Sequence, residues 1–400
     1  MSKVHSNLER LARGKPKYES WQKVTVLLDG LSPEAQSDAV DCFEAASTHW
    51  PTGLDPWTGF SLEPGIELRR SPTTWVKEVY LGQHAPKHRC IRILESPRRP
   101  MRGQKLANLL SEGAETTNLS QVGYNQQRVS AGYLKSWKGE GAWQQWQALR
   151  LWTCELKPGP LKALVKANLT SLSSLNLTQN HMGPAGAAVL VKAPGFSALT
   201  GISLDYNRLG SEGAGHLARA DWMQRIERLD LAYNGLDDVG LAALVEQGLP
   251  ALRWLSLADN PFGASGAWMA GLPALEHLDL SGTQLTDAAL TELLGHGEKL
   301  SSLVVKKTGI GDAAARSIAG HGPSLKTLDL SETKLTPTGL AAILTGPVAK
   351  GIRGLRLREG LDMANAQRIL DGACPKLKKL WWHGPSVAEP VSDALKASGY

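Results

Sequence analysis

The sequence predicts an α/β solenoid, a horseshoe with a parallel concave sheet, convex helices and a mainly helical N-terminal cap. Three observations support this fold class. A leucine phrase recurs at a nearly fixed period, and a segment of helical pattern follows each copy. The composition, with 42% hydrophobic and 20% charged residues, is that of a folded chain. Such repetition is typical of a chain whose turns pack mainly against their neighbours.

The leucine phrase has the form L-x-x-L-x-L-x-x-N, and its nine positions are numbered in that order below. Its copies start at Trp146, Leu172, Leu199, Ile226, Leu252, Leu275, Leu300, Leu325, Ile352 and Leu377, in steps of 23 to 27 residues. An extended strand points the leucines at positions 4 and 6 to one side and the residue between them to the other. One strand cannot bury its leucines alone, so the turns must stack and pair their strands. At position 9, Asn180, Asn207, Asn234 and Asn260 are predicted to bond backbone groups of the turn, with Thr or Cys as partial substitutes.

The segments between the phrases predict helices on the outer side of the solenoid. Leu241, Leu244 and Val245 show the three-and-four spacing of an amphipathic helix. We expect Asp287 and Asp312 to be helix N-caps, and glycines such as Gly248 and Gly297 to lie at helix ends.

The N-terminal part is less regular. Helices are predicted over residues 3–13, 18–28 and 33–49, the last capped by Ser32, and strands are predicted from Thr73 and Cys90. A phrase from Leu119 precedes Trp146 by one period, which indicates that the array begins before it. We therefore predict an N-terminal helical cap region with possible degenerate repeats over residues 1–117. The solenoid is predicted over residues 118–400, with clear repeats over 146–400.

These phrases resemble the leucine-rich repeat family, in particular its ribonuclease-inhibitor-like class, which is bacterial-type here and has a helix in each repeat. The resemblance covers residues 146–400. It implies a protein that binds a partner on the concave strand face and has no chemistry of its own.

Aromatic and acidic side chains gather at the outward positions of the central repeats. Exposed aromatic residues often anchor interfaces, because they bury a large area with little loss of side-chain entropy. A patch of this kind suits a basic protein surface, although Asp at position 5 and Tyr beside position 9 also have structural explanations. The predicted partner-binding residues are Trp152, Asp205, Tyr206, Asp230, Tyr233, Trp254 and Asp259.

The sign of the charge reverses toward the C-terminus. Residues 350–380 contain eight Lys and Arg against three Asp and Glu. A basic face with an aromatic residue suits an acidic protein or a phosphate backbone. The possible anionic-partner patch comprises Arg353, Arg356, Arg358, Lys378, Lys379 and Trp381. The net charge of +6 on the whole chain is mild, so nucleic acid is the less favoured partner.

The sequence offers little for catalysis, and we predict no catalytic residue, cofactor or metal. His84, His88 and Cys90 come closest to a metal-ligand spacing, but Pro86 interrupts any helix that would align the two histidines. The charged start of the chain and the lack of a long apolar run predict a cytoplasmic protein without a membrane segment. The sequence does not decide the oligomeric state.

Two functions follow from these patterns. The preferred one is a non-catalytic scaffold for protein–protein interaction that holds a partner on the concave face. The alternative is an adaptor or effector whose N-terminal region recruits or modifies a target that the repeats select.

Overall fold

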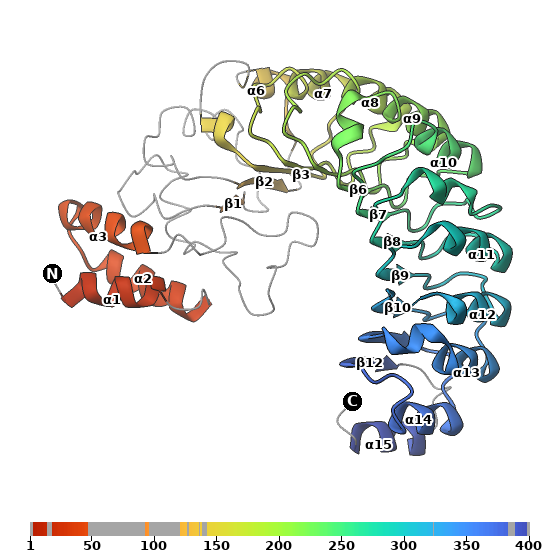
Figure 1. Cartoon of the computed structure of the whole chain (residues 1–400). Coiled ribbons are helices and arrows are strands. Elements are labelled where there is room, and N and C mark those ends of the chain that lie inside the picture. Colours follow the sequence, from red (N-terminus) through yellow and green to blue (C-terminus); the bar gives the residue numbers. More distant parts are fainter. Residues whose placement is uncertain are drawn as a thin grey trace. The chain divides into compact units, whose positions relative to one another are not determined.

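Short strands and short helices alternate along most of the chain in the computed structural model (Figure 1). The structure describes residues 3–13, 18–46, 93–95, 121–125, 128–135, 137, 142–322, 324–382 and 389–397. Contacts divide the chain into two units, which are described separately. Unit 1 comprises Met1–His181 and Lys192–Ser203, and unit 2 comprises Met182–Val191 and Leu204–Tyr400. The predicted boundary between residues 117 and 118 stays a prediction.

The described part of unit 1 contains the three N-terminal helices and five strands. Each of these strands pairs in parallel with the next one along the chain. Ser32 caps the third helix, because the backbone N–H of Ala35 donates to Ser32 Oγ at 3.4 Å. The phrase from Leu119 forms a strand, as predicted, and pairs with a strand that precedes it. The elements are α1 (Lys3–Arg13), α2 (Tyr18–Asp29), α3 (Pro33–Ala46), β1 (Ile93–Glu95), β2 (Gln121–Asn125), α6 (Ala131–Lys135), a 3₁₀ turn (Ala142–Gln145), β3 (Ala148–Trp152), α7 (Pro158–Leu164), β4 (Ser174–Asn176) and β5 (Gly201–Ser203). The strand predicted from Thr73 lies outside the described residues.

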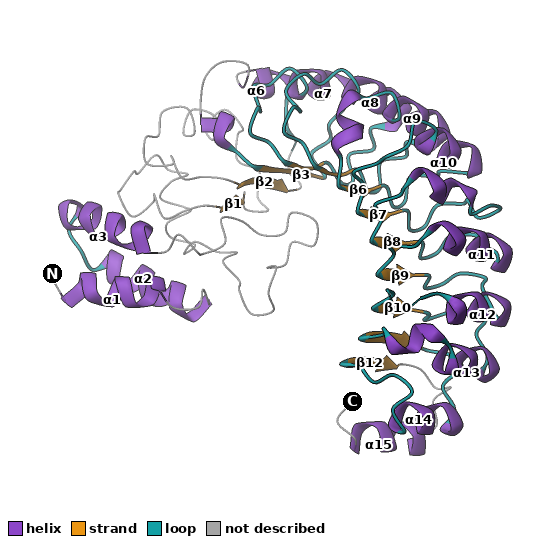
Figure 2. Ribbon diagram, in the orientation of Figure 1, coloured by secondary structure: helices purple, strands orange, loops and turns teal. Residues whose placement is uncertain are grey.

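Unit 2 contains seven described strands that pair in parallel where register is given, with helices along their other side (Figure 2). The strands are β6 (Arg228–Asp230), β7 (Trp254–Ser256), β8 (His277–Asp279), β9 (Ser302–Val304), β10 (Thr327–Asp329), β11 (Gly354–Leu357) and β12 (Lys379–Trp382). The α-helices are α8 (Gly183–Leu190), α9 (Gly210–Leu217), α10 (Asp238–Val245), α11 (Asp287–His296), α12 (Asp312–Gly320), α13 (Pro337–Thr345), α14 (Met363–Leu370) and α15 (Glu389–Ala397). A 3₁₀ turn over Ala267–Gly271 replaces the α-helix after β7. The alternation confirms the predicted α/β solenoid.

The leucines of the phrase form the core between strands and helices. In the turn of β7, Leu252, Leu255 and Leu257 are all fully buried, and the turns of β6, β8, β9, β10 and β11 repeat this pattern. In the turn of β12, Leu380 is buried but Leu377 and Trp382 are only partly buried. In unit 1, Trp146 takes the place of the first leucine and packs edge-on against Trp137, with ring centroids 5.2 Å apart. Burial of these side chains removes apolar surface from water and is the main stabilising term of the fold.

The position 9 asparagines form a ladder that ties each turn to the one before it. Asn260 Oδ1 accepts from the backbone N–H groups of Asn234 and Leu236, at 3.1 and 3.0 Å. Its Nδ2 donates to the carbonyls of Leu231 and Leu257, at 2.9 Å each. The amide therefore satisfies buried backbone groups where the chain leaves the strand, as predicted.

Threonine and cysteine do part of the same work. Thr283 Oγ1 donates to the carbonyl of Leu280 at 2.7 Å, and Thr308 and Thr333 repeat this bond in the next turns. In unit 1, Cys154 Sγ lies 3.0 Å from the carbonyl oxygen of Tyr124. Each replaces one of the several bonds that an asparagine makes.

The predicted caps Asp287 and Asp312 are not N-caps. Thr286 caps α11 by accepting from the N–H of Ala289, and Gly311 stands at the cap of α12. Each aspartate instead opens its helix and reaches the following turn, since Asp287 Oδ1 accepts from Gly311 N–H at 2.7 Å. The error arose because a carboxylate at the first helical residue and one at the cap have similar sequence surroundings.

Candidate functional site

The outward positions of unit 2 divide into two regions that differ in chemistry. Positions 3, 5, 7 and 8 of successive turns lie side by side, because the strands pair in register; for example, Asp329 lies beside Arg356, which lies beside Trp381. The turns of β6 and β7 carry aromatic and acidic residues, and those of β10 to β12 carry most of the cations. Together these positions form the strand face.

Three aspartates at position 5 have a structural role. Asp230 Oδ1 accepts from the N–H of Ala232, and Asp279 and Asp329 accept from Ser281 and Ser331 in the same way. Each carboxylate therefore stabilises the start of the turn two residues further on, in the manner of an Asx turn. Asp230 nevertheless contributes its charge to the region around it.

The residue at position 8 adopts the left-handed backbone conformation. The φ angles of Tyr206, Tyr233 and Asp259 are 58°, 52° and 51°. Glycine adopts this conformation without strain, as Gly282 does in the next turn, whereas other residues lose roughly 1 kcal/mol. The fold therefore does not require a tyrosine at this position.

Two tyrosines and three aspartates form what we call the aromatic–acidic surface, namely Asp205, Tyr206, Asp230, Tyr233 and Asp259. The rings of Tyr206 and Tyr233 lie 5.1 Å apart, and these residues are 40% and 48% exposed. A hydrogen bond to the Asp259 carboxylate raises the pKa of Tyr233 to about 12. Asp205 is half-buried, and its Oδ1 is buried without a hydrogen-bond partner. Burial, and then repulsion from Asp230 and Asp259, raise the pKa of Asp205 to about 7.

The Trp254 ring contacts side chains of neighbouring turns, which the sequence did not predict. Its ring stacks on His277 with centroids 5.3 Å apart and planes 4° apart, and the Arg228 guanidinium lies 5.4 Å from its centroid. The three residues occupy position 3 of β6, β7 and β8. Burial, together with the charge of Arg228, lowers the pKa of His277 to about 4. The sequence analysis did not foresee this stack, although the common position of the three residues could have revealed it.

Trp152 belongs to unit 1, whereas the other predicted partner-binding residues belong to unit 2. Its indole N–H donates to Gln179 Oε1 at 3.0 Å, and Thr153 Oγ1 donates to the same oxygen at 3.1 Å. Trp152 is therefore held by the position 8 residue of the next turn.

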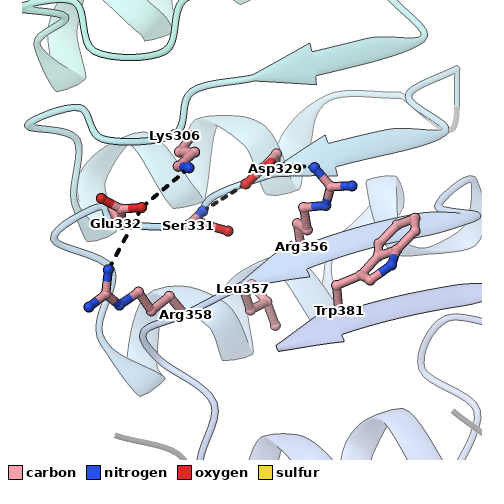
Figure 3. Close-up of a pocket in the computed structure, with 8 residues that line it drawn as sticks. All are labelled: Lys306, Asp329, Ser331, Glu332, Arg356, Leu357, Arg358 and Trp381. Atoms are coloured by element: carbon pink, nitrogen blue, oxygen red, sulfur yellow. Dashed lines mark hydrogen bonds and ion pairs between the residues drawn. The ribbon is translucent and has the colours of Figure 1, made fainter. Parts of the chain in front are cut away.

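A pocket of about 540 Å³ lies among the C-terminal strands of unit 2 (Figure 3). Trp381 and Leu357 contribute apolar surface to this C-terminal pocket. Arg356 lies 3.5 Å from Asp329 and 4.7 Å from the Trp381 ring centroid, while Lys379 lies 5.9 Å from that centroid. The polar lining consists of Lys306, Asp329, Ser331, Glu332, Arg356 and Arg358.

Arg356, Arg358 and Trp381 of the predicted anionic-partner patch line one pocket, and the sequence did not predict that acidic side chains line it as well. The assignment of the patch to a partner stays a prediction. Glu332 lies between Lys306 and Arg358, at 3.4 and 3.7 Å. Lys306 stands at position 7 of the phrase from Leu300, and Glu332 stands at position 8 of the phrase from Leu325. Reading these two positions in the template could have predicted the Lys306–Glu332 pair. Arg353 and Lys378 are exposed at position 2 and do not line the pocket.

Comparison with known families agrees with this geometry. A family profile described as "Leucine rich repeat" matches residues 224–285, and another described as "Leucine Rich repeat" matches 168–191 and 321–344. The matched segments are leucine-rich repeats. The matched segments fall in both units, on phrases that form strand and turn as the repeat template requires.

Several solved structures match the chain, with identities of 20% or below. The TLR13–ssRNA13 complex matches with a TM-score of 0.47 and 18% identity, over 72% of this chain and 39% of that one. Internalin C2 of Listeria monocytogenes matches with a TM-score of 0.41 and 20% identity, over 57% and 91% of the two chains. The internalin InlF of the same organism gives 0.36 and 18%, over 70% and 93%. No curated protein matches the sequence.

Among the residues that the structure describes, no three His, Cys, Asp or Glu side chains are grouped so that they could hold a metal. His84, His88 and Cys90 lie outside the described residues. None of the helices in the described ranges has the length and apolar character needed to cross a membrane.

Proposed function

We propose that this protein is a non-catalytic scaffold that binds a protein partner on the strand face of its leucine-rich repeats. The aromatic–acidic surface, with Trp254 beside it, is the proposed contact region in unit 2. Its partner is a protein surface rich in Lys and Arg. Trp152 is proposed as a contact of unit 1.

One observation carries the proposal: two exposed tyrosine rings lie 5.1 Å apart among aspartates that repel one another. The raised pKa of Asp205 means that this carboxylate loses free energy by being charged in its present surroundings. Burial is the larger part of that cost and repulsion from Asp230 and Asp259 the smaller part. A cationic side chain would offset the repulsion, and the tyrosine rings offer it both apolar area and a cation–π contact. A basic partner is therefore favoured over an acidic one at this surface.

The test is a selection of phage-displayed random peptides, of about twelve residues, against the full chain at pH 8. We expect Lys- and Arg-rich peptides that bind at least about five-fold more weakly to a Tyr206→Gly/Tyr233→Gly variant. Glycine is chosen because it fits the left-handed backbone at both positions. Val239→Ala, which alters a 73% exposed side chain on α10, is the matched control. This surface would be rejected by a selection that enriches no Lys- or Arg-rich peptide. It would also be rejected if such peptides bound the tyrosine variant as tightly as the unchanged protein.

The adaptor alternative is favoured by the N-terminal helices. In unit 1, α1 packs against α3 and α2, and Cys42 Sγ lies 4.0 Å from the carbonyl oxygen of His5. Deletion of residues 1–46 removes these three helices and leaves the residues of β1 in the chain. An adaptor would lose its biological output while keeping partner affinity, whereas a simple scaffold would keep both.

Two narrower inferences accompany the main proposal. The ribonuclease-inhibitor-like class is supported by the α-helix that follows most of the described strands of unit 2. A cytoplasmic location stays a prediction, which the location of a tagged full-length chain in its native host would test.

A further inference from the structure

Three cations of the C-terminal pocket, Arg356, Arg358 and Lys306, each lie near an acidic side chain. The Arg356–Asp329, Arg358–Glu332 and Lys306–Glu332 distances are 3.5, 3.7 and 3.4 Å. Charge-assisted hydrogen bonds are shorter, at about 2.7–2.9 Å. The side chains of Arg356, Arg358 and Lys306 are still 54%, 45% and 46% exposed. Arg358 also lies 3.7 Å from Glu359. An incoming carboxylate could form closer contacts with Arg356 and Lys306 than Asp329 and Glu332 do.

The aromatic wall of the pocket lies against β11. Gly354 has no side chain, and a Cβ built on it would lie 3.5 Å from the Trp381 ring, which is an ordinary van der Waals distance. The ring therefore lies over the backbone of Gly354. Arg356 is held between this ring and the buried carboxylate of Asp329. Figure 3 shows the guanidinium beside Asp329 with the indole next to it. Apolar surface and a positioned guanidinium thus lie within one pocket.

The surroundings of the pocket add positive charge. Lys326, Arg353 and Lys378 occupy position 2 of three successive turns, and all three are exposed. Arg353 N–H donates to the Lys326 carbonyl at 2.7 Å, and Lys378 N–H donates to the Arg353 carbonyl at 2.8 Å, so the turns are adjacent. Within the described part of the chain, these three side chains form no ion pair. Neighbouring strands are about 4.8 Å apart, which places three unpaired cations in one row.

We propose that the C-terminal pocket binds an acidic peptide segment of a protein partner. A carboxylate of the segment binds Arg356 and Arg358, an apolar side chain packs on Trp381, and further carboxylates face the row of Lys326, Arg353 and Lys378. This goes beyond the function proposed above, because it concerns another site and a partner of opposite charge.

The acidic residues of the pocket favour a peptide over a nucleic acid. A nucleic acid backbone carries closely spaced phosphates along its length, and Asp329 and Glu332 would repel those that enter the pocket. A peptide can place single carboxylates at the cations and apolar groups elsewhere. Leu357 and Trp381 provide the surface for those apolar groups.

The test uses the same random-peptide selection against the full chain, followed by fluorescence anisotropy with a selected acidic peptide and with a single-stranded oligonucleotide. We expect enriched peptides that combine Asp or Glu with an aromatic or aliphatic residue. Arg356→Gln and Arg358→Gln should each weaken binding at least about five-fold. Arg356→Lys should give a smaller loss, because it keeps the charge but not the planar fork. The matched control is Arg316→Gln, which removes an exposed cation on α12.

Three results would overturn the proposal. They are selection without acidic peptides, equal effects of Arg316→Gln and Arg356→Gln, and tighter Arg356-dependent binding of the oligonucleotide, which would assign the pocket to nucleic acid. The Tyr206→Gly/Tyr233→Gly variant should bind acidic peptides normally. Failure of this proposal and failure of the proposed function are therefore distinguishable.

Discussion

The aromatic–acidic surface and the C-terminal pocket stand on the same repeated backbone but treat charge in opposite ways. In the first, Asp205 lies near Asp230 and Asp259, and its pKa rises to about 7. In the second, Asp329 and Glu332 each lie near an arginine. The backbone positions are equivalent, so the difference comes only from the side chains at positions 5, 7 and 8.

The two regions also differ in the residue that supports the turn. Asparagine stands at position 9 beside the aromatic–acidic surface, whereas Thr308, Thr333 and Gly360 stand there beside the pocket. Asparagine makes several buried bonds and threonine makes one. The turns in which Asp205 lies near two other aspartates are therefore also the turns with the larger number of asparagine hydrogen bonds.

The largest expected effect tests that difference in support. Asn260→Ala removes the acceptor of two backbone N–H groups and the donor to two backbone carbonyls. We therefore expect a loss of about 4 kcal/mol in the free energy of unfolding. Thr333→Ala removes one bond and should cost about 1 kcal/mol. Urea unfolding followed by circular dichroism measures both. Equal losses would contradict the idea that the turns differ in firmness.

The next effect concerns Asp205 and pH. The folded state binds a proton at Asp205 below a pKa of about 7, whereas the unfolded state does so only near 3.8. Charged Asp205 therefore destabilises the fold above pH 7, and this penalty disappears as the pH falls toward 4. Asp205→Asn should stabilise the protein by up to about 3 kcal/mol at pH 8 and have little effect at pH 4. Urea unfolding at both pH values would detect this, and an equal effect at the two would exclude it.

His277 should show the opposite pH dependence. Its pKa is lowered to about 4 in the folded state from a reference value of 6.5. The stability is therefore complete above pH 6.5 and is lost as the pH falls toward 4, because the unfolded state binds the proton first. His277→Gln should have a small effect at pH 8 and stabilise by up to about 2 kcal/mol at pH 5. A variant that is destabilised equally at both pH values would show that the stack on Trp254 outweighs the titration.

The smallest effect concerns the paired charges of the pocket. Arg356 is 54% exposed, so Arg356→Gln should change the free energy of unfolding by less than about 1 kcal/mol. Asp329→Ala should cost about 2 kcal/mol, because Asp329 is buried and accepts from Ser331 N–H. Thermal melts of the two variants would rank them. A larger loss for Arg356→Gln would mean that the arginine supports the fold rather than a ligand.

Much of the fold was predictable, because the spacing of the leucines determines which side chains of each strand are buried. Buried Leu252, Leu255 and Leu257, and the bonds of Asn260, follow from the alternation of a strand and from the need to satisfy backbone groups at a turn. The first depends on residues close in sequence, and the second recurs because the same side chain stands at position 9 of successive phrases. The helices at 3–13 and 33–46 were also predictable from residues close in sequence.

The candidate sites were only partly predictable, because they depend on contacts between turns. The stack of Trp254 on His277 joins residues of different repeats, and so do the pairs of Glu332 with Lys306 and Arg358. The sequence shows the residue types at each position but not the side-chain directions that bring them together. It also could not show that Trp152 and Trp254 belong to different units.

The asparagine ladder has a direction. The Asn260 side chain accepts from Asn234 and Leu236, so the chain reversal that follows β6 is completed by a residue of the next turn. A protein shortened to end at residue 257 would leave those two N–H groups of its final turn without acceptors. A form shortened before an asparagine turn must therefore supply a terminal residue that closes the last turn, so repeats cannot be removed there by cutting alone.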